Sequence, residues 1–353
     1  MGVGAYFIVS AMFEKAYVLA GQLLVLGRQW RQPRLVAQGY RMLANLCFYE
    51  GAIDRALEYS EQALRLVDPH SNGPRPIIDD IDEWVDDLAI PCFAHLVQAR
   101  PGVSQRFSRQ LLEVVRGPGS TTRGTALVYL SAACQLRGEV PCTLELAEEG
   151  AAVASGMVFQ PLLAFARGLR GWALSRLGRT REGLESLRSG IGLMRELGAR
   201  ALMPYYLCLL ADVSLLLGQV EEGLAMVKEA LGLVEETRVR LFEAELYRLQ
   251  GELLRVAGKE ADARHSLLRA AVISHRQRAW LFELRARVAL ARQLRDTGHP
   301  DAARRGLERL CGRFAPDLEV PELQEARALL TSLRATPGSP PHPPRESPPG
   351  AAR

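Results

Sequence analysis

The chain of 353 residues lacks the long apolar segments of a membrane protein. A membrane-spanning helix needs roughly 20 consecutive apolar residues, and no uninterrupted run approaches that length. The apolar beginning, "MGVGAYFIVSAMFEK", is too short to cross a bilayer and has no basic segment ahead of it, unlike a secretion signal. We therefore expect no membrane partner and a cytoplasmic location.

Lysine is nearly absent, and neither sign of charge is in marked excess. The chain has 44 basic residues, but its lysines are only Lys15, Lys228 and Lys259, and its formal net charge is +4. Nucleic-acid-binding domains are typically strongly basic, with Arg and Lys gathered on one face. The small net charge gives no reason to expect nucleic acid as a partner.

Short motifs of catalysis and of metal or nucleotide binding are also missing. The chain contains no G-x-x-x-x-G-K-[ST], no H-E-x-x-H, no G-x-S-x-G and no C-x-x-C. Its six cysteines are Cys47, Cys92, Cys134, Cys142, Cys208 and Cys311. Because they show no zinc-like spacing, we expect free thiols in a reduced core. These absences predict a protein that is not an enzyme and that binds no metal or cofactor.

Helix-forming residues at an even interval dominate the chain. Aromatics make up 7% and apolar residues 48%, a balance typical of a folded all-α protein when β-branched residues are few. Glycines recur every 40 residues. The series is Gly138, Gly178, Gly218, Gly258 and Gly298, with Gly51 and Ala11 in an earlier register. A fixed period of this size is typical of stacked helical hairpins, in which the glycine ends the first helix.

Small residues flank the turn glycines at fixed offsets. Seven residues before the glycine stand Ala44, Ser131, Gly171, Ala211, Gly251 and Ala291. Five residues after it stand Ala56, Gly183, Gly223, Ala263 and Ala303. Small side chains at these offsets allow two antiparallel helices to approach closely, while leucines between them fill the interface.

This spacing resembles the tetratricopeptide repeat (TPR), whose units are usually six residues shorter. The resemblance implies an all-α, right-handed α-solenoid over residues 1–334. Its units would be a partial first repeat at about 1–23, repeats centred on Gly51, about residue 98, Gly138, Gly178, Gly218, Gly258 and Gly298, and a capping helix at about 320–333. We expect an irregular insertion at 68–91, which includes the acidic run "DDIDEWVDD", and a disordered proline-rich tail at 335–353.

The last four repeats show a narrower resemblance. Phrases such as "RGWALSRLGRTREGLESLRSGI", "FEAELYRLQGELL" and "PELQEARALL" are similar to the C-terminal TPR regions of bacterial multidomain signalling regulators. Those regulators join a nucleotide-cyclase or DNA-binding domain to an ATPase module. Since no P-loop is present here, the resemblance implies a regulatory or sensory segment separated from its catalytic modules, acting on an ATPase or cyclase in trans.

The first helix of each hairpin in such a stack lines a concave groove. Six residues before the turn glycines, we expect groove-lining side chains at Asn45, Ala132, Trp172, Asp212, Glu252 and Arg292. Neighbouring groove positions in the C-terminal repeats add Arg248, Arg255 and Arg295. Trp172 is the candidate aromatic anchor, with simple packing as the alternative.

The four arginines around Glu252 suggest a basic patch for an acidic peptide, since arginine binds carboxylates through two hydrogen bonds. The alternative is an ordinary solvated face in which Arg248 and Arg255 pair with Glu252 within one helix. The leading functional hypothesis is a non-catalytic scaffold that binds a peptide or helix of a partner protein in this groove.

Overall fold

Helices form nearly all of the secondary structure in this computed structural model, which describes residues 2–66, 77–78, 81–116, 120–156, 160–315 and 318–335. The helices in these ranges are α1 (Val3–Val9), α2 (Phe13–Gln29), α3 (Pro33–Tyr49), α4 (Ile53–Leu66), α5 (Glu83–Val97), α6 (Pro101–Val115), α7 (Ser120–Leu136), α8 (Val140–Ser155), α9 (Gln160–Arg176), α10 (Thr180–Glu196), α11 (Met203–Leu216), α12 (Val220–Thr237), α13 (Glu243–Val256), α14 (Glu260–Gln277), α15 (Trp280–Asp296), α16 (Pro300–Cys311) and α17 (Pro321–Ala335). One short antiparallel pair, β1 (Ile77–Ile78) with β2 (Ile81–Asp82), precedes α5.

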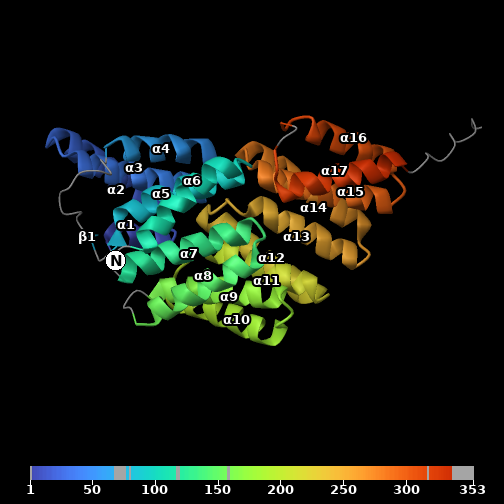
Figure 1. Ribbon diagram of the computed structural model, residues 1–353, viewed down its shortest axis with the longest axis horizontal. Helices are drawn as coiled ribbons and strands as arrows, with labels where there is room; N and C mark the ends of the chain where they lie inside the picture. Colours follow the sequence, from blue (N-terminus) through green and yellow to red (C-terminus); the bar gives the residue numbers. More distant parts are fainter. Residues whose placement is uncertain are drawn as a thin grey trace, which may run out of the picture.

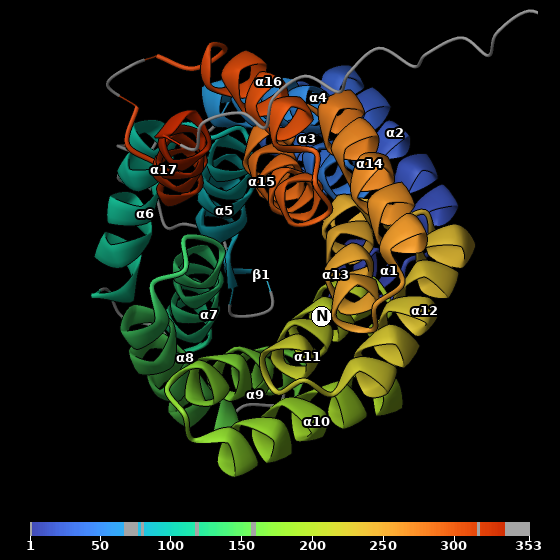
Figure 2. The same cartoon turned by 90° about the vertical axis from the view of Figure 1, so that its right-hand side faces the viewer.

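The helices stack as antiparallel hairpins that curl around an open centre. Helices α7, α9, α11, α13 and α15 face the centre in Figure 2, and their partners α8, α10, α12, α14 and α16 lie outside them. The stack advances along the longest axis of the molecule, from the N-terminal helices at one end to α15–α17 at the other (Figure 1). The predicted all-α helical-repeat solenoid is therefore correct. Among the helices that the structure describes, none has the length and apolar character needed to cross a bilayer.

Each hairpin turn contains a residue with positive φ. The six predicted turn glycines from Gly51 to Gly298 have φ angles between 69° and 82°. In the degenerate repeat, Ala99 takes this place with a φ of 53°, and Ala11 does so at the start of the chain with 57°. The turn between α5 and α6 therefore keeps the geometry of the others without the residue that adopts it most easily.

Backbone contact between paired helices explains the small residues. A Cβ atom built on Gly171 of α9 would lie 2.5 Å from the amide nitrogen of Leu187 and 2.6 Å from the carbonyl oxygen of Gly183, both in α10. A Cβ on Gly251 of α13 would lie 2.6 Å from Cγ of Leu267 in α14. At these positions the facing helix occupies the space of a side chain, so only glycine fits.

Repeats far apart in the chain pack against one another. The amide groups of Arg240 and Leu241 both donate to the carbonyl oxygen of Tyr49, at 2.8 and 3.1 Å. Arg278, after α14, forms an ion pair of 2.6 Å with Asp54 in α4. One hydrophobic core joins buried residues of α3–α7 to buried residues of α15–α17. The superhelix thus completes a circle, and residues more than 180 positions apart in the chain share one core.

Helix α5 begins inside the segment that the sequence suggested to be irregular. Residues 83–91 belong to α5, so the predicted insertion at 68–91 is wrong over this part. Val85, Leu88 and Ala89 are buried, and the Asp87 carboxylate accepts hydrogen bonds of 2.7 and 2.8 Å from Arg41. The acidic run suggested a solvated loop. Instead, Asp87 is buried in an ion pair with Arg41, and Pro91 lies within α5. Residues 68–76 and 79–80 of the insertion, and the tail from 336 on, lie outside the described residues.

Two of the cysteines expected to be free are joined instead. Cys134 in α7 and Cys142 in α8 form a disulfide, with their Cα atoms 6.0 Å apart. They stand four residues before and four after Gly138, and the antiparallel hairpin brings those two positions face to face. Glu139 lies close enough to complete a three-ligand metal cluster with them, but the disulfide occupies both sulfur atoms and Glu139 pairs with Arg137. Cys47, Cys92 and Cys208 are buried free thiols, as expected, and Cys311 is a partly exposed one.

From the close contact between α9 and α10 we predict how a single added methyl group changes the stability of the protein. Gly171→Ala places a Cβ against the backbone of α10 and should lower the free energy of unfolding by about 2 kcal/mol. Gly192→Ala in α10 is the matched control, because a Cβ there meets open space and should stabilise the helix by up to about 1 kcal/mol. Urea denaturation of both variants measures the difference, and equal stabilities would refute the close contact.

Candidate functional site

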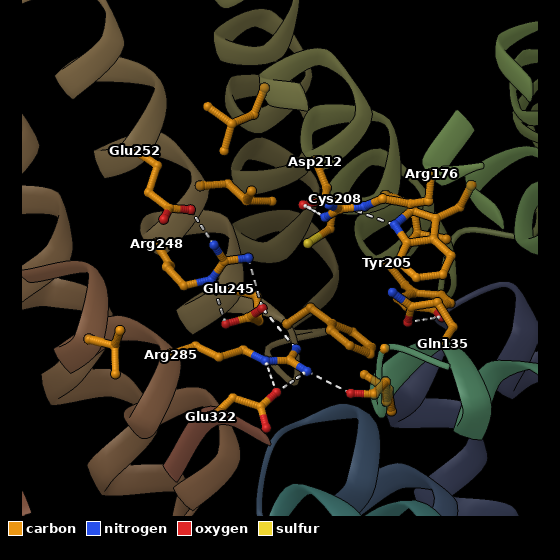
Figure 3. A pocket seen from close by; sticks show the side chains of 18 of the residues that line it. Gln135, Arg176, Tyr205, Cys208, Asp212, Glu245, Arg248, Glu252, Arg285 and Glu322 are labelled. Carbon is orange, nitrogen blue, oxygen red and sulfur yellow. Dashed lines mark hydrogen bonds and ion pairs between the residues drawn. The ribbon is translucent and has the colours of Figure 1, made fainter. Parts of the chain in front are cut away.

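A cavity of about 510 Å³ lies on the concave side of the solenoid. Its walls come from the turn between α7 and α8 and from the inner helices α9, α11, α13, α15 and α17. Figure 3 shows charged and aromatic side chains from these separate helices pointing toward one another across it. The curvature of the stack, and not any single repeat, therefore creates this site.

Four of the six predicted site residues line the cavity. They are Trp172, Arg248, Glu252 and Arg292. Arg255 and Arg295 do not, and both instead pair with Asp296, with nitrogen–oxygen distances of 3.7 and 2.8 Å. The side chains of these two arginines are 38% and 45% exposed.

Glu245 of α13 is the centre of an ion-pair network. Its carboxylate accepts hydrogen bonds from Nε and Nη2 of Arg248 at 3.0 and 3.1 Å, and from Nη1 of Arg285 at 3.3 Å. Arg248 also bonds Glu252 one helical turn away. Arg285 bonds Glu322 of α17 at 2.9 Å and the carbonyl oxygen of Leu136 at 2.6 Å. The network connects α7, α13, α15 and α17 across the cavity wall (Figure 3).

The charge state of Glu245 follows from its two arginine partners. Burial alone would raise the pKa of this carboxyl, but the charges of Arg248 and Arg285 outweigh it and lower the pKa below its ordinary value. Burial disfavours the charged guanidinium of Arg248, yet Glu245 and Glu252 raise its pKa well above the ordinary value. Glu245, Arg248 and Arg285 are therefore ionised at neutral pH.

Trp172 is held in place by a second, smaller cluster. Its indole Nε1 donates to Oδ2 of Asp212 at 2.8 Å, and Asp212 also pairs with Arg176 at 2.7 Å. The Arg176 guanidinium lies 5.6 Å from the centre of the Trp172 ring. Only 4% of Trp172 is exposed, so the ring is packed into the wall of the cavity.

The expectation of a basic patch is wrong. Five carboxylates, from Asp212, Glu245, Glu252, Glu322 and Glu325, line the cavity beside four arginines. Each of these arginines is paired, and Arg292 pairs with Glu325. The alternative predicted from the sequence is that Arg248 and Arg255 both pair with Glu252 within one helix. Arg248 does pair with Glu252, whereas Arg255 pairs with Asp296 of the next repeat. The prediction missed Glu245, which lies on the same helix as Arg248, and Glu322 and Glu325, which α17 contributes.

A second, apolar chamber adjoins the charged cavity. Its volume is about 70 Å³, and its walls include Phe48, Phe93, Tyr129 and Phe165. Leu136, Tyr205 and Phe242 line both spaces, so the two lie side by side. The hydroxyl of Tyr205 donates to Gln135 at 2.8 Å, and its ring stacks on Phe242 with centroids 4.6 Å apart.

Comparison with known proteins identifies the fold. No family model and no curated protein matches the chain. Among solved structures, a Rap protein complexed with competence and sporulation factor has a TM-score of 0.59 at 10% identity and covers 84% of this chain and 80% of that one. NprR in complex with its cognate peptide NprX has a TM-score of 0.51 at 14% identity, with 81% and 82% covered.

A third similar structure is a signal transduction ATPase with numerous domains from Pyrococcus horikoshii, described as having a tetratricopeptide repeat sensor. Its TM-score is 0.50 at 12% identity, and the match covers 90% of this chain. The chain has a tetratricopeptide-repeat fold. It spans 49%, about half, of the length of that ATPase protein, so the TPR array corresponds to only part of the larger molecule.

The TPR period contains a signal for the residues that sequence reasoning missed. Glu245, Arg285 and Tyr205 each stand thirteen residues before a turn glycine, as does Phe165. Positions six, ten and thirteen before the glycine lie on one helix face, because they differ by four and three residues. The inner surface therefore extends one helical turn farther along each inner helix than the predicted groove did.

Glu245→Gln should show how much the buried network contributes to stability. Removing the charge leaves Arg248 and Arg285 short of a buried partner, so the free energy of unfolding at pH 7 should fall by about 3 kcal/mol. Glu236→Gln, which alters an exposed pair with Arg200, is the control and should change stability by less than about 1 kcal/mol.

The same variant has a pH signature. Because the pKa of Glu245 is lowered in the folded protein, its ion pairs stabilise the fold above the ordinary value of 4.5 and are lost as the pH falls through the lower folded value. The loss of stability of the parent protein as the pH falls below 4.5 should therefore be shallower in Glu245→Gln. Parallel stability curves would contradict the network.

Proposed function

We propose that this TPR protein is a non-catalytic scaffold that binds a peptide or helical segment of a partner protein in its central cavity. The observation that carries the proposal is the cavity of about 510 Å³, walled by the inner helices of successive repeats. It combines aromatic faces, fixed charges and an apolar chamber, which together suit a peptide with side chains of several kinds. A solenoid presents such a concave surface along its whole length.

The similar structures support a peptide as the ligand class. NprR was solved with its cognate peptide and the Rap protein with competence and sporulation factor. Both share the fold over more than four-fifths of this chain, although identity is only 14% and 10%. The acidic partner suggested by the arginines receives no support from the cavity, because carboxylates compensate every arginine that lines it.

A pair of substitutions on α15 tests whether the cavity is the binding site. Arg292 lines the cavity and Arg295 does not, while the side chains of both are 45% exposed. Peptides selected from a random phage-displayed library on the full chain provide the probes. Arg292→Trp fills part of the cavity and should weaken their binding by about tenfold or more, whereas Arg295→Trp should change it by less than about twofold.

Fluorescence anisotropy of labelled peptides measures both affinities. If the library yields no binding peptide, the scaffold proposal fails. If both variants weaken binding equally, the cavity is not the site.

A second candidate function is that of a sensory or regulatory TPR segment working with an ATPase or cyclase module in trans. The structural similarity to the Pyrococcus horikoshii ATPase with a TPR sensor favours this class. It predicts an ATPase or cyclase encoded beside this chain, whose nucleotide turnover changes when the purified TPR chain is added. An unchanged turnover rate at saturating TPR chain would exclude this candidate.

A further inference from the structure

Every guanidinium nitrogen of the two deepest arginines of the cavity already donates a hydrogen bond within the protein. In Arg248, Nε, Nη1 and Nη2 all bond oxygens of Glu245 or Glu252. In Arg285, the same three nitrogens bond Glu322, Glu245 and the carbonyl oxygen of Leu136. The side chains of Arg248 and Arg285 are only 14% and 20% exposed. Carboxylates already balance the positive charges of both arginines, so an anionic ligand would gain little attraction from them and would lose its hydration in a largely buried site.

Carboxylate oxygens of the cavity, in contrast, remain available. Glu252 uses only Oε2, toward Arg248, and Glu322 uses only Oε1, toward Arg285. Within the part of the chain that the structure describes, Glu252 Oε1 and Glu322 Oε2 have no hydrogen-bond or ion-pair partner. Both residues line the cavity with side chains 17% and 13% exposed, and Figure 3 shows them on opposite sides of the Arg248–Glu245–Arg285 chain.

A cationic group of a ligand could therefore bind Glu252 Oε1 or Glu322 Oε2 without breaking any hydrogen bond within the protein. A neutral ligand would leave the excess of carboxylates over arginines uncompensated, whereas a single positive charge balances it. The aromatic rings of Tyr205 and Phe242 line the same space and provide faces for the aliphatic stem of a long basic side chain. The charged cavity thus favours a basic group on the ligand.

The apolar chamber favours an apolar residue next to the basic residue of the ligand. Because Leu136, Tyr205 and Phe242 line both spaces, a ligand in the cavity lies directly beside the chamber. The chamber has a volume of about 70 Å³ and a largely aromatic wall, so it has room for one apolar side chain and not for a chain segment. It excludes a charged group, which would lose its hydration there without a partner.

From these contacts we infer that the cavity recognises a peptide segment in which a lysine or arginine stands next to a bulky apolar residue. The basic side chain bonds Glu252 or Glu322, and the apolar one enters the adjoining chamber. This inference rests on the proposed function and adds the chemistry of its ligand. It reverses the acidic peptide that the arginine-rich sequence suggested.

The random phage-displayed peptide library tests this chemistry on the full chain. Selected peptides should be enriched in Lys or Arg beside Leu, Ile, Met or Phe, and replacing the basic residue by Glu should weaken binding by about a hundredfold. Binding should also weaken as salt is added. The double variant Glu252→Gln/Glu322→Gln keeps both side-chain shapes and one acceptor oxygen each, so it tests the charges and not the packing.

We expect the double variant to weaken binding of the basic peptides by about tenfold or more while leaving the affinity for their Lys→Gln analogues within about twofold. Glu61→Gln, on the outer helix α4 with its side chain 68% exposed, is the matched control and should leave all affinities unchanged. Circular dichroism confirms that each variant is folded.

The outcomes separate the two proposals. Enrichment of acidic peptides, or of peptides without a basic residue, overturns this inference and leaves the scaffold function standing. Equal weakening of basic peptides and their Gln analogues by the double variant also overturns it. A library that yields no binding peptide removes the scaffold function itself.

Discussion

The contact between helix backbones inside each hairpin is the constraint on which the rest of the structure depends. Gly171 and Gly183 leave no space for a Cβ between α9 and α10, so the two helices approach until their backbones touch. Small residues recur at the same offsets from the turn glycines, and they set how closely the two helices of each hairpin approach. Equal hairpins stacked at an equal pitch must curve regularly, and this curvature brings α7, α13, α15 and α17 around one cavity.

Curvature also explains why charged groups can be buried in an otherwise apolar stack. Glu245, Arg248 and Arg285 come from two neighbouring inner helices, and Glu322 from the last one, so no repeat carries the network alone. Glu245, Arg248 and Arg285 each have at least two partners at hydrogen-bonding distance, which offsets their loss of hydration. The network ties the C-terminal repeats to the turn after α7 through the carbonyl oxygen of Leu136. The same groups therefore support the architecture and set the electrostatics of the candidate site.

The architecture was predictable from the sequence because glycine geometry and small-residue spacing are local properties that repeat. The site was predictable only in part. Trp172, Arg248, Glu252 and Arg292 lie where the period places them, but Glu322 and Glu325 come from α17, outside the repeat register. Their pairing with Arg285 and Arg292 depends on how far the superhelix turns, which no single unit encodes. The Cys134–Cys142 bond and the helical identity of residues 83–91 were missed for a related reason: each depends on a facing partner and not on local composition.

The shared core between the first and last repeats changes how this array can behave. In an open solenoid, terminal units fray independently because each touches only its neighbours. Here Tyr49 accepts hydrogen bonds from Arg240 and Leu241, and α3–α7 share buried side chains with α15–α17. Opening either end therefore uncovers both, so the array should melt as one cooperative body. If the cavity binds a peptide as proposed, the peptide would enter and leave along the axis of the superhelix, because entry from the side would require the packed repeats to separate.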